Sequence, residues 1–441
     1  MKYFVNIKTV FPTINRDIEQ LKEVYKDKNR LISLIDKVID NRLNNTDIAD
    51  KRILIKPNWV RHSKIKEDEW CLRTHDNFLL ATLEYMLRLK PKEVMIGDAP
   101  IQGCHWSKMV TSELKNAIEK LSKKYDIPVE IKDFRRVHFD RELNNAIEQK
   151  EPLEDYVIFD VGKKSYLEPI TEKGKNNFRV TVYNPDRFKE SHRPGVHKYC
   201  ISKELFDADV VISLPKVKTH QKAGITAALK NIVGLNGDKD FLPHHRVGGT
   251  DFGGDCYPGG SKLRYWSELS LDNANRNKGK WLYSIWIKVT SLLWRLSLPK
   301  KVHSLAAGWY GNDTTWRMVM DLNQIIYFGN KNGKLSDKRQ RLFFSLCDGI
   351  IGGQGDGPLK PEQLPLGVLS FTNTSSWNDL VLSQIMGMES EKIPLLVSAK
   401  SFEKDAKIEF NLNGDFVNYK DFSKLAIQAE MPPGWTNYNN I

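Results

Sequence analysis

Short apolar runs alternate along the chain with longer segments of helical periodicity. The short runs have the length and β-branched content of strands, whereas the longer segments carry apolar side chains at intervals of three and four residues. Strands are predicted at 51–58, 93–99 and 128–134, and helices at 76–90 and 106–124. This alternation is typical of βαβ units, in which a helix connects two parallel strands.

Three later runs are apolar at almost every position, which is typical of strands that are covered on both faces. They are ADVVISLPKVK (208–218), RLFFSLCDGIIGG (341–353) and LGVLSFTN (366–373). The whole pattern predicts an α/β fold with a layered, open and mostly parallel sheet that has helices on both faces. Glycine and aspartate gather at 248–260, where we expect a loop, and charges cluster at 135–155, where we expect an insertion or linker.

The segment 273–312 is different, because it contains no Asp or Glu but seven Lys and Arg residues and a strongly apolar middle. Folded as a helix, residues 281–297 place a narrow polar stripe on one side and tryptophans and aliphatic side chains over the rest. The stripe consists of Ser284, Lys288, Ser291 and Arg295. The run is too short and too charged to span a bilayer. We expect a mostly buried helix with one wet edge; the alternatives are a helix on a membrane surface and a lid over a lipid-like substrate.

The composition is that of a folded protein with a net positive charge. Of the 441 residues, 40% are hydrophobic and 28% are charged, close to the usual balance of globular domains. Lys and Arg number 67 against 55 Asp and Glu, which gives a net charge of +12. This excess favours an anionic partner, such as a phosphorylated metabolite or an acidic membrane. Because no nucleic-acid-binding motif is present, we expect no nucleic acid partner.

The five cysteines, at positions 71, 104, 200, 256 and 347, are far apart and form no CxxC pair. A zinc knuckle or a locally ligated iron–sulfur cluster therefore has no ligand set, and we expect reduced thiols and no iron–sulfur cluster. A bound metal ion stays open, since His244, His245, Asp251 and Asp255 lie near one another in the sequence. The first twenty residues contain no apolar stretch of signal-peptide length, so we expect a cytoplasmic protein without a cleaved leader.

The densest signal for chemistry is LPKVKTHQKAGITAALKNIVGLNG at 214–237. A strand with alternating basic side chains leads through a glycine loop into a helix that is expected to begin near Thr226. Ligands of open α/β sheets bind at the carboxyl ends of strands, and helix N-termini attract anions. Clustered cations also lower the pKa of a lysine, so that one lysine could act as an acid or base. The candidate residues of this segment are Lys216, Lys218, His220, Thr226, Lys230 and Asn231.

Three other predicted strands also end in polar side chains. Lys56 and Asn58 end the first strand, Asp98 ends the second, and Asp348 lies beside a glycine-rich run in the strand at 341–353. Because ligands collect at one edge of an open sheet, we expect Lys56, Asp98, Asp348 and the basic segment to converge on one pocket.

Six motifs follow one another along the chain. They are IKPNWV (55–60), MIGDAP (95–100), the segment 214–234, GNDTTWRMVMDLN (311–323), DGIIGGQGDGPL (348–359) and LGVLSFTNTSSWNDLVLSQIMGM (366–388). In this order they resemble the motifs of the domain-of-unknown-function 362 family, from about residue 50 to residue 395. The resemblance implies no particular reaction; many relatives carry a ferredoxin-like iron–sulfur module, for which this chain lacks clustered cysteines. It adds Asp379 as a site candidate, whereas Gln354 and Thr374 stand where acids are usual.

The resemblance also suggests a domain organisation. We expect a helical N-terminal extension at 1–50, a family α/β domain at 50–400 and a C-terminal extension at 401–441. The family domain would contain a loop-rich, basic and apolar insertion at 238–312.

Taken together, the residues favour an enzyme that acts by acid–base chemistry on an anionic substrate, phosphorylated or carboxylated and in one version lipid-linked. His220, Lys218 and Asp98 are the predicted catalytic residues. The predicted substrate-binding residues are Lys56, Asn58, Lys216, Thr226, Lys230, Asn231, Asp348 and Asp379. Two alternatives stay open: a redox protein that works with a separate ferredoxin, and a non-catalytic protein that binds a membrane surface through 280–303.

Overall fold

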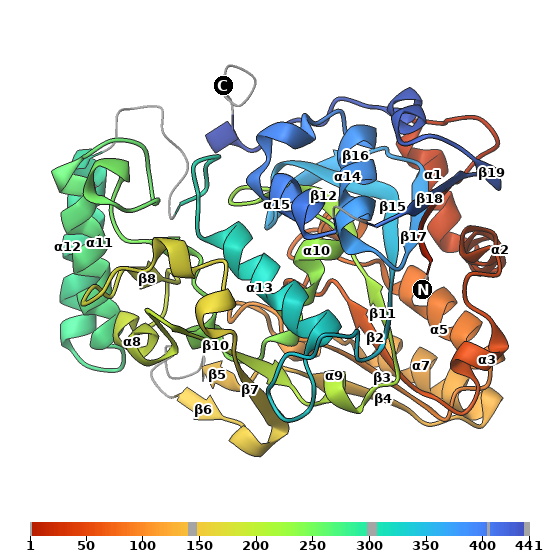
Figure 1. Ribbon diagram of the computed structural model, residues 1–441, viewed down its shortest axis with the longest axis horizontal. Helices are drawn as coiled ribbons and strands as arrows, with labels where there is room; N and C mark the ends of the chain where they lie inside the picture. The colour runs from red at the N-terminus through yellow and green to blue at the C-terminus, as the bar shows by residue number, and fades with distance from the viewer. Residues whose placement is uncertain (1, 140–147, 298–306, 404–405, 436–441) are drawn as a thin grey trace.

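The centre of the protein is one large mixed sheet, seen in a computed structural model that describes residues 2–139, 148–297, 307–403 and 406–435 (Figure 1). In pairing order its strands are β19 (Asp415–Phe416), β18 (Ile408–Leu412), β1 (Tyr3–Thr9), β17 (Val368–Thr372), β15 (Leu342–Asp356), β11 (Val210–Leu214), β2 (Arg52–Pro57), β3 (Glu93–Asp98) and β4 (Val129–Asp133). The run from β15 to β4 is parallel throughout. β12 (Lys216–His220) and β16 (Lys360–Leu364) also pair with β15, and β13 (Gly224–Thr226) pairs with β12.

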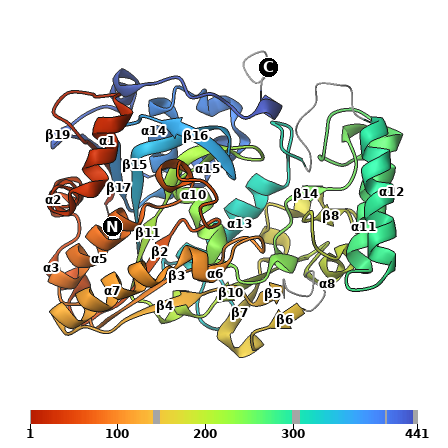
Figure 2. The ribbon, with the colours of Figure 1, turned by 180° about the vertical axis from the view of Figure 1, so that it is seen from behind.

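Helices cover both faces of this sheet, and alternate positions of its central strands enter two separate apolar cores (Figures 1 and 2). Leu54 of β2 lies in one core, whereas its neighbours Ile53 and Ile55 lie in the other. The helices that pack around Ile53 are α1 (Ile18–Lys26), α2 (Lys28–Ile39), α5 (Asp76–Arg88) and α7 (Ser112–Tyr125). Those that pack around Leu54 are α10 (Ala228–Asn231), α13 (Thr315–Phe328), α14 (Ser375–Ile385) and α15 (Pro394–Phe402). The predicted α/β fold with helices on both faces is confirmed.

Both ends of the described chain contribute strands to this sheet. β1 pairs antiparallel with β17 and parallel with β18, so residues near the two termini lie side by side. The segment 1–50, predicted as helical, therefore contains a sheet strand besides α1, α2 and the short helix α3 (Asn45–Ile48). Asn6 is tolerated on this buried strand because its side-chain amide donates a hydrogen bond to Val38 O at 3.0 Å.

Several predicted elements are divided in the structure for local reasons. The helix predicted at 106–124 is two helices, α6 (Trp106–Met109) and α7, because the Thr111 hydroxyl accepts from Leu114 N and caps a new start. The strand predicted at 208–218 divides at Pro215 into β11 and β12. The charged segment 135–155 contains the hairpin strands β5 (Val137–Phe139) and β6 (Glu148–Lys150). Smaller sheets are formed by β7 (Tyr156–Asp160), β10 (Val196–Ser202) and β9 (His192–Arg193), and by β14 (His245–Arg246) and β8 (Phe178–Arg179).

A helical hairpin stands at one end of the molecule, away from the large sheet (left in Figure 1). It consists of α11 (Lys262–Arg276) and α12 (Leu282–Ser297). The expectation of a mostly buried helix at 281–297 is wrong, since no residue of α12 is buried. No helix in the described parts of the chain is long and apolar enough to cross a membrane. Of the segment 280–303 predicted for membrane contact, residues 298–303 lie outside the described residues.

Candidate functional site

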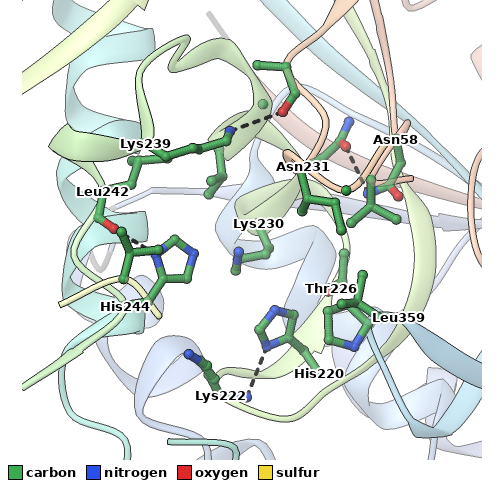
Figure 3. A pocket seen from close by; sticks show the side chains of 18 of the residues that line it. Asn58, His220, Lys222, Thr226, Lys230, Asn231, Lys239, Leu242, His244 and Leu359 are labelled. Carbon is green, nitrogen blue, oxygen red and sulfur yellow. Dashed lines mark hydrogen bonds between the residues drawn. The ribbon is translucent and has the colours of Figure 1, made fainter. Parts of the chain in front are cut away.

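A cavity of about 460 Å³ lies at the carboxyl ends of β2 and β3, beside β12 and α10 (Figure 3). It sits where the rule for open α/β sheets expects a ligand. Eight of the predicted site residues line it: Lys56, Asn58, Asp98, Lys218, His220, Thr226, Lys230 and Asn231. The other three, Lys216, Asp348 and Asp379, do not. The predicted convergence therefore holds for β2, β3 and the basic segment, but not for Asp348.

Lys56 and Asp98 form a buried ion pair on the cavity wall, with Nζ and Oδ1 2.8 Å apart. The Asp98 carboxylate also accepts the backbone N–H groups of Trp59 at 2.7 Å and Ala99 at 2.8 Å. Gly234 makes this arrangement possible, because a Cβ there would lie 1.7 Å from Asp98 Oδ1. Asp98 is thus fully engaged by Lys56 and the backbone, and it fixes the strand ends.

Asn231 connects the two sides of the cavity floor. Its Nδ2 donates to Lys56 O at 3.2 Å and to Ser213 Oγ at 2.9 Å. Its Oδ1 accepts from Lys56 Nζ at 3.3 Å and from Asn58 Nδ2 at 3.1 Å. Because every polar atom of this amide has a partner, the network sets the positions of Lys56 and Asn58.

Lys218 is buried, and its ammonium group is fully hydrogen-bonded to uncharged oxygen atoms. Its ammonium donates to the carbonyl of Leu72, to Pro358 O at 3.2 Å and to Asn58 Oδ1 at 3.4 Å. Burial lowers the pKa of Lys218 to about 7, and repulsion from Lys216 and Lys230 adds to the effect. All three hydrogens of this group are therefore in use before any ligand arrives.

Lys230 and Lys222 present ammonium groups to the cavity for which the described residues provide no hydrogen bond or ion pair. In Figure 3 Lys230 points into the middle of the cavity, between His220 and His244. Burial lowers the pKa of Lys230 to about 7, with further lowering by Lys239, Lys222 and Lys56, and burial lowers the pKa of Lys222 to about 8. The buried hydroxyl of Thr226, also in the lining, likewise has no partner among the described residues. These groups are available to a ligand.

Two histidines flank Lys230 in complementary tautomers. His220 Nδ1 accepts from Lys222 N at 3.0 Å, which leaves the proton on Nε2. His244 Nδ1 lies 2.7 Å from Leu242 O and donates to it, which leaves a lone pair on Nε2. Burial and the nearby lysines keep the pKa of both rings well below its usual range, so both are neutral. The cavity thus offers one imidazole donor and one imidazole acceptor.

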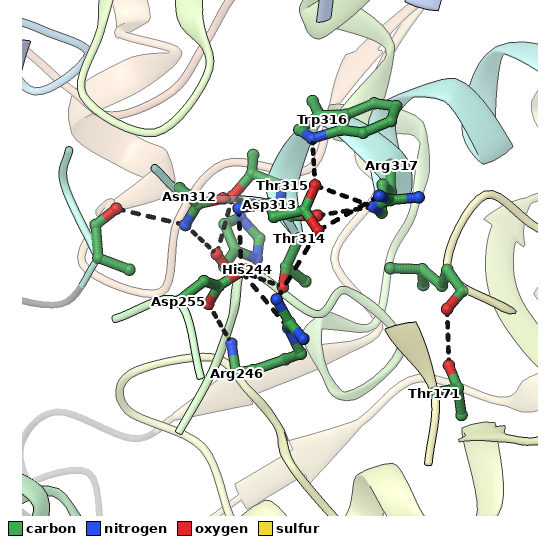
Figure 4. Close-up of polar contacts among 12 residues, drawn as sticks. Thr171, His244, Arg246, Asp255, Asn312, Asp313, Thr314, Thr315, Trp316 and Arg317 are labelled. Carbon is green, nitrogen blue, oxygen red and sulfur yellow. Dashed lines mark hydrogen bonds and ion pairs between the residues drawn. The ribbon is translucent and has the colours of Figure 1, made fainter. Parts of the chain in front are cut away.

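His244 is held from behind by the motif at 311–323 (Figure 4). Its carbonyl accepts from Asn312 Nδ2 at 2.9 Å and from Thr315 Oγ1 at 2.8 Å. Asp255, in the same network, accepts from Thr314 Oγ1 at 2.5 Å and Asp313 N at 3.0 Å. These contacts fix the loop that carries His244 against α13.

The residues considered for a metal do not gather. His244 faces the cavity, Asp255 is bonded to the start of α13, and Asp251 lies in an exposed turn. Within the described residues, no three His, Cys, Asp or Glu side chains form a group that could hold a metal ion.

The cysteines do not suit an iron–sulfur cluster. All five are free and buried. Burial raises the pKa of Cys71 and of Cys104 to about 11, which opposes the thiolate form that ligates iron.

Lys216 and Asp348 form a separate, completely buried centre. Lys216 Nζ donates to Asp348 Oδ2 at 2.6 Å and to Tyr25 OH at 3.1 Å, and Tyr25 OH donates to Asp348 Oδ1 at 2.5 Å. This triad joins α1 to β12 and β15. The two residues were predicted to bind substrate, but their charges and hydrogen bonds are directed to each other and away from the cavity lining.

The helix predicted to begin near Thr226 begins later, and its first N–H groups are bonded to Asp379. Thr226 ends β13, and α10 begins two residues later at Ala228 and has four residues. The Asp379 carboxylate accepts the N–H groups of Ala228 at 2.8 Å and Leu229 at 2.9 Å. The predicted anion site at this helix start is therefore wrong, because the carboxylate of α14 already occupies it.

Sequence reasoning missed three residues of the cavity as parts of an anion site: Lys222, Lys239 and His244. Lys222 follows His220 by two positions in the basic segment, which was a usable signal. Lys239 and His244 come from the predicted loop-rich insertion, where no periodicity indicates a direction. Lys239 Nζ donates to Ala99 O at 3.1 Å, and burial lowers its pKa to about 8.

Comparison with known proteins gives a family match over part of the chain and no activity. The model of a domain of unknown function, DUF362, matches residues 159–375, just under half of the chain. No curated protein matches the sequence. The crystal structure of a Thermotoga maritima protein, a structural-genomics target, has a TM-score of 0.32 at 11% identity over 77% of this chain. This chain spans 54% of the length of that protein.

Proposed function

We propose a function from the cavity itself, because the DUF362 description that matches residues 159–375 assigns no activity. The cavity binds a phosphorylated or carboxylated small molecule and carries out acid–base chemistry on it. The observation that carries this proposal is Lys230, whose ammonium faces the cavity without a partner among the described residues.

The charge balance of the lining supports an anionic ligand. The lining contains five lysines, at positions 56, 218, 222, 230 and 239, and among its described residues a single carboxylate, Asp98, which is paired with Lys56. An anion between Lys230 and Lys222 would relieve their mutual repulsion and form charge-assisted hydrogen bonds, each worth about 1.5–3 kcal/mol. The hydroxyl of Thr226 and Nε2–H of His220 provide further donors to the same ligand.

Proton transfer is the chemistry that these groups support best. A lysine whose pKa is about 7 exchanges its proton readily at neutral pH, which is the condition for an efficient general acid or base. His220 offers a proton on Nε2 and His244 offers a lone pair. In this proposal Lys230 and His244 act on the substrate. Lys218 and Asp98, predicted as catalytic, instead hold the residues of the cavity floor in place, because their hydrogen bonds are made within the protein.

The apolar part of the lining indicates a substrate with an apolar portion. It consists of aliphatic side chains from several segments: Val60, Ile101, Val180, Val182, Leu242 and Leu359. An anionic group held by Lys230 would leave the remainder of the ligand against some of these side chains.

Binding is tested with inorganic phosphate and citrate as probes, by calorimetry and thermal shift. We expect both anions to stabilise the wild type and Lys230→Met to weaken the binding at least tenfold. The matched control is Lys115→Met, which removes the same charge from an exposed position of α7. No stabilisation by any anion, or equal losses in the two variants, would contradict the proposal.

Acid–base capacity is tested by amine labelling followed by mass spectrometry. The labelling rate of Lys230 should rise with a midpoint near pH 7, far below that of Lys115, because the neutral amine is the reactive form. Identical midpoints for the two lysines would remove the acid–base part of the proposal and leave an anion-binding protein.

A further inference from the structure

α12 is an apolar helix that has no covering layer in the described structure. One side packs along α11, where Ser267 Oγ donates to Thr290 O at 3.2 Å and Ser270 Oγ donates to Trp286 O at 3.3 Å. The other side faces solvent: Trp281, just before the helix, is 75% exposed, Leu292 59% and Leu296 63%. Large apolar side chains clustered on one exposed face mark an interaction surface.

The acidic side chains of the hairpin face the body of the protein, and basic side chains are in excess on its outer face. Residues 262–297 contain seven Lys and Arg residues but only two acids, Glu268 and Asp272. Both acids turn inward, since Glu268 accepts Gly248 N at 2.7 Å and Asp272 pairs with Arg179 at 2.9 Å. Both acids are therefore directed to the body of the protein, and the outer face of the hairpin is positive.

Apolar and basic side chains share this outer face. Trp281, Lys288, Leu292 and Arg295 are exposed and follow one another at intervals of seven, four and three residues, which places them on one side of the helix. Tryptophan and leucine between Lys and Arg are typical of a helix that lies in a membrane interface, where the apolar groups enter the acyl boundary and the cations meet phosphate.

We propose that the α11–α12 hairpin docks on a bilayer surface that contains anionic lipid. α12 lies flat in the interface, because its 16 residues are too few to span the hydrocarbon core. Trp281, Leu292 and Leu296 enter the apolar boundary, while Lys288 and Arg295 contact lipid phosphates.

Part of the cavity lining is attached to this hairpin. Lys278, after α11, donates through Nζ to Val182 O at 2.6 Å, and Asn275 Nδ2 donates to Thr181 O at 3.1 Å. Thr181 and Val182 belong to the cavity lining, and Val182 is 48% exposed. Docking would thus bring this part of the lining close to the membrane. As a consequence that rests on the proposed function, the anionic substrate would be presented by the bilayer.

Co-sedimentation with phosphatidylcholine vesicles, with and without phosphatidylglycerol, tests the docking. We expect the full chain to bind only the anionic vesicles, and the triple variant Trp281→Ser, Leu292→Ser, Leu296→Ser to bind at least tenfold more weakly. The matched control is Ile65→Ser with Phe416→Ser, which removes apolar side chains that are 61% and 74% exposed elsewhere. Lys288→Gln with Arg295→Gln should weaken binding and reduce its dependence on salt.

Three outcomes would overturn the docking: no binding by the wild type, equal losses in the control, or a dimer that the triple variant abolishes, which would show that a second copy covers the hairpin. Phosphate binding by the triple variant serves as the test of folding. Lys230→Met should lose phosphate binding but keep vesicle binding, so failure of the cavity and failure of the docking are distinguished.

Discussion

Lys216 and Lys230 belong to the same short segment, but the fold treats them in opposite ways. Lys216 is completely buried against Asp348 and Tyr25, with the carboxylate 2.6 Å away. Lys230 faces a cavity in which the described residues offer it no acceptor. A cluster of lysines in the sequence is therefore not one functional unit. A lysine that is paired within the core contributes to the stability of the fold, whereas an unpaired lysine in a cavity is available to bind a ligand.

Lys218 and Lys56 lie between these extremes, since both line the cavity and both are fully bonded. Lys218 is bonded to carbonyl and amide oxygens, and Lys56 is bonded to Asp98. Lys218 contributes positive charge to the cavity, whereas the charge of Lys56 is balanced by Asp98, and neither offers a free hydrogen-bond donor. Substitution of Lys216 should therefore reduce mainly the stability, and substitution of Lys230 should reduce mainly the binding of a ligand. The effects of substituting Lys218 or Lys56 should lie between these two.

The largest effect is expected for Lys216→Met, which leaves the Asp348 carboxylate buried without its cation. Removing one partner of such a pair costs about 3–5 kcal/mol in the free energy of unfolding. Urea denaturation measures this loss, with Lys115→Met as the control. Adding Asp348→Asn to Lys216→Met should recover part of the stability, because the uncompensated charge is gone; an undiminished loss would show that packing, not charge, is responsible.

Gly234→Ala should have the next largest effect. The new Cβ would lie 1.7 Å from Asp98 Oδ1 and 2.8 Å from Lys56 Nζ, so the ion pair has to move. Overpacking of this kind costs about 1–3 kcal/mol. Denaturation should show this loss and calorimetry a weaker affinity for phosphate. An unchanged phosphate affinity in a destabilised variant would show that the Lys56–Asp98 pair does not shape the cavity.

The pH dependence of stability should distinguish Lys230 from its paired neighbours. The pKa of Lys230 is about 7 in the fold and about 10.4 in an unfolded chain, so between these values the unfolded state binds more protons. Stability without anion should therefore rise with pH above 7. From pH 7 to 9 the wild type should gain about 1–2 kcal/mol relative to Lys230→Met. Parallel curves for the two proteins would mean that Lys230 has an ordinary pKa.

Phosphate affinity should change in the opposite direction over the same pH range. Deprotonation of Lys230 and Lys222, whose pKa values are about 7 and about 8, removes the charges that attract the anion. Calorimetry at pH 6 and pH 9 should show weaker binding at the higher pH in the wild type, and a smaller change in Lys230→Met, in which only Lys222 of this pair still loses its charge.

The smallest effect is expected for Thr226→Val, which removes a buried hydroxyl without a partner. The free energy of unfolding should stay nearly constant, because no hydrogen bond of the described structure is lost. The affinity for phosphate should fall about threefold to tenfold, the equivalent of one neutral hydrogen bond. A loss of stability without a loss of affinity would place this hydroxyl in the fold and not in the site.

The sequence by itself determined the central layer of the protein. Nearly continuous apolar runs predicted β11, β15 and β17, because a strand buried on both faces has to be apolar at nearly every position, and the alternation of short strands with helices predicted β2, β3 and β4. It also determined that Lys56, Asp98 and Lys218 would meet, since parallel strands joined by helices bring their carboxyl ends to one edge of the sheet. Both conclusions depend on local patterns and on simple topology.

Only the tertiary structure decided which charges are free. Asp348 pairs with Lys216 from 132 positions away, and Asp379 bonds to the start of α10 from 151 positions away. The exposure of α12 was decided in the same way, by the absence of a covering element in the described structure, although its composition agrees equally well with a core helix. Partners and coverage depend on residues distant in sequence, and a local pattern of hydrophobic and charged positions contains no information about them.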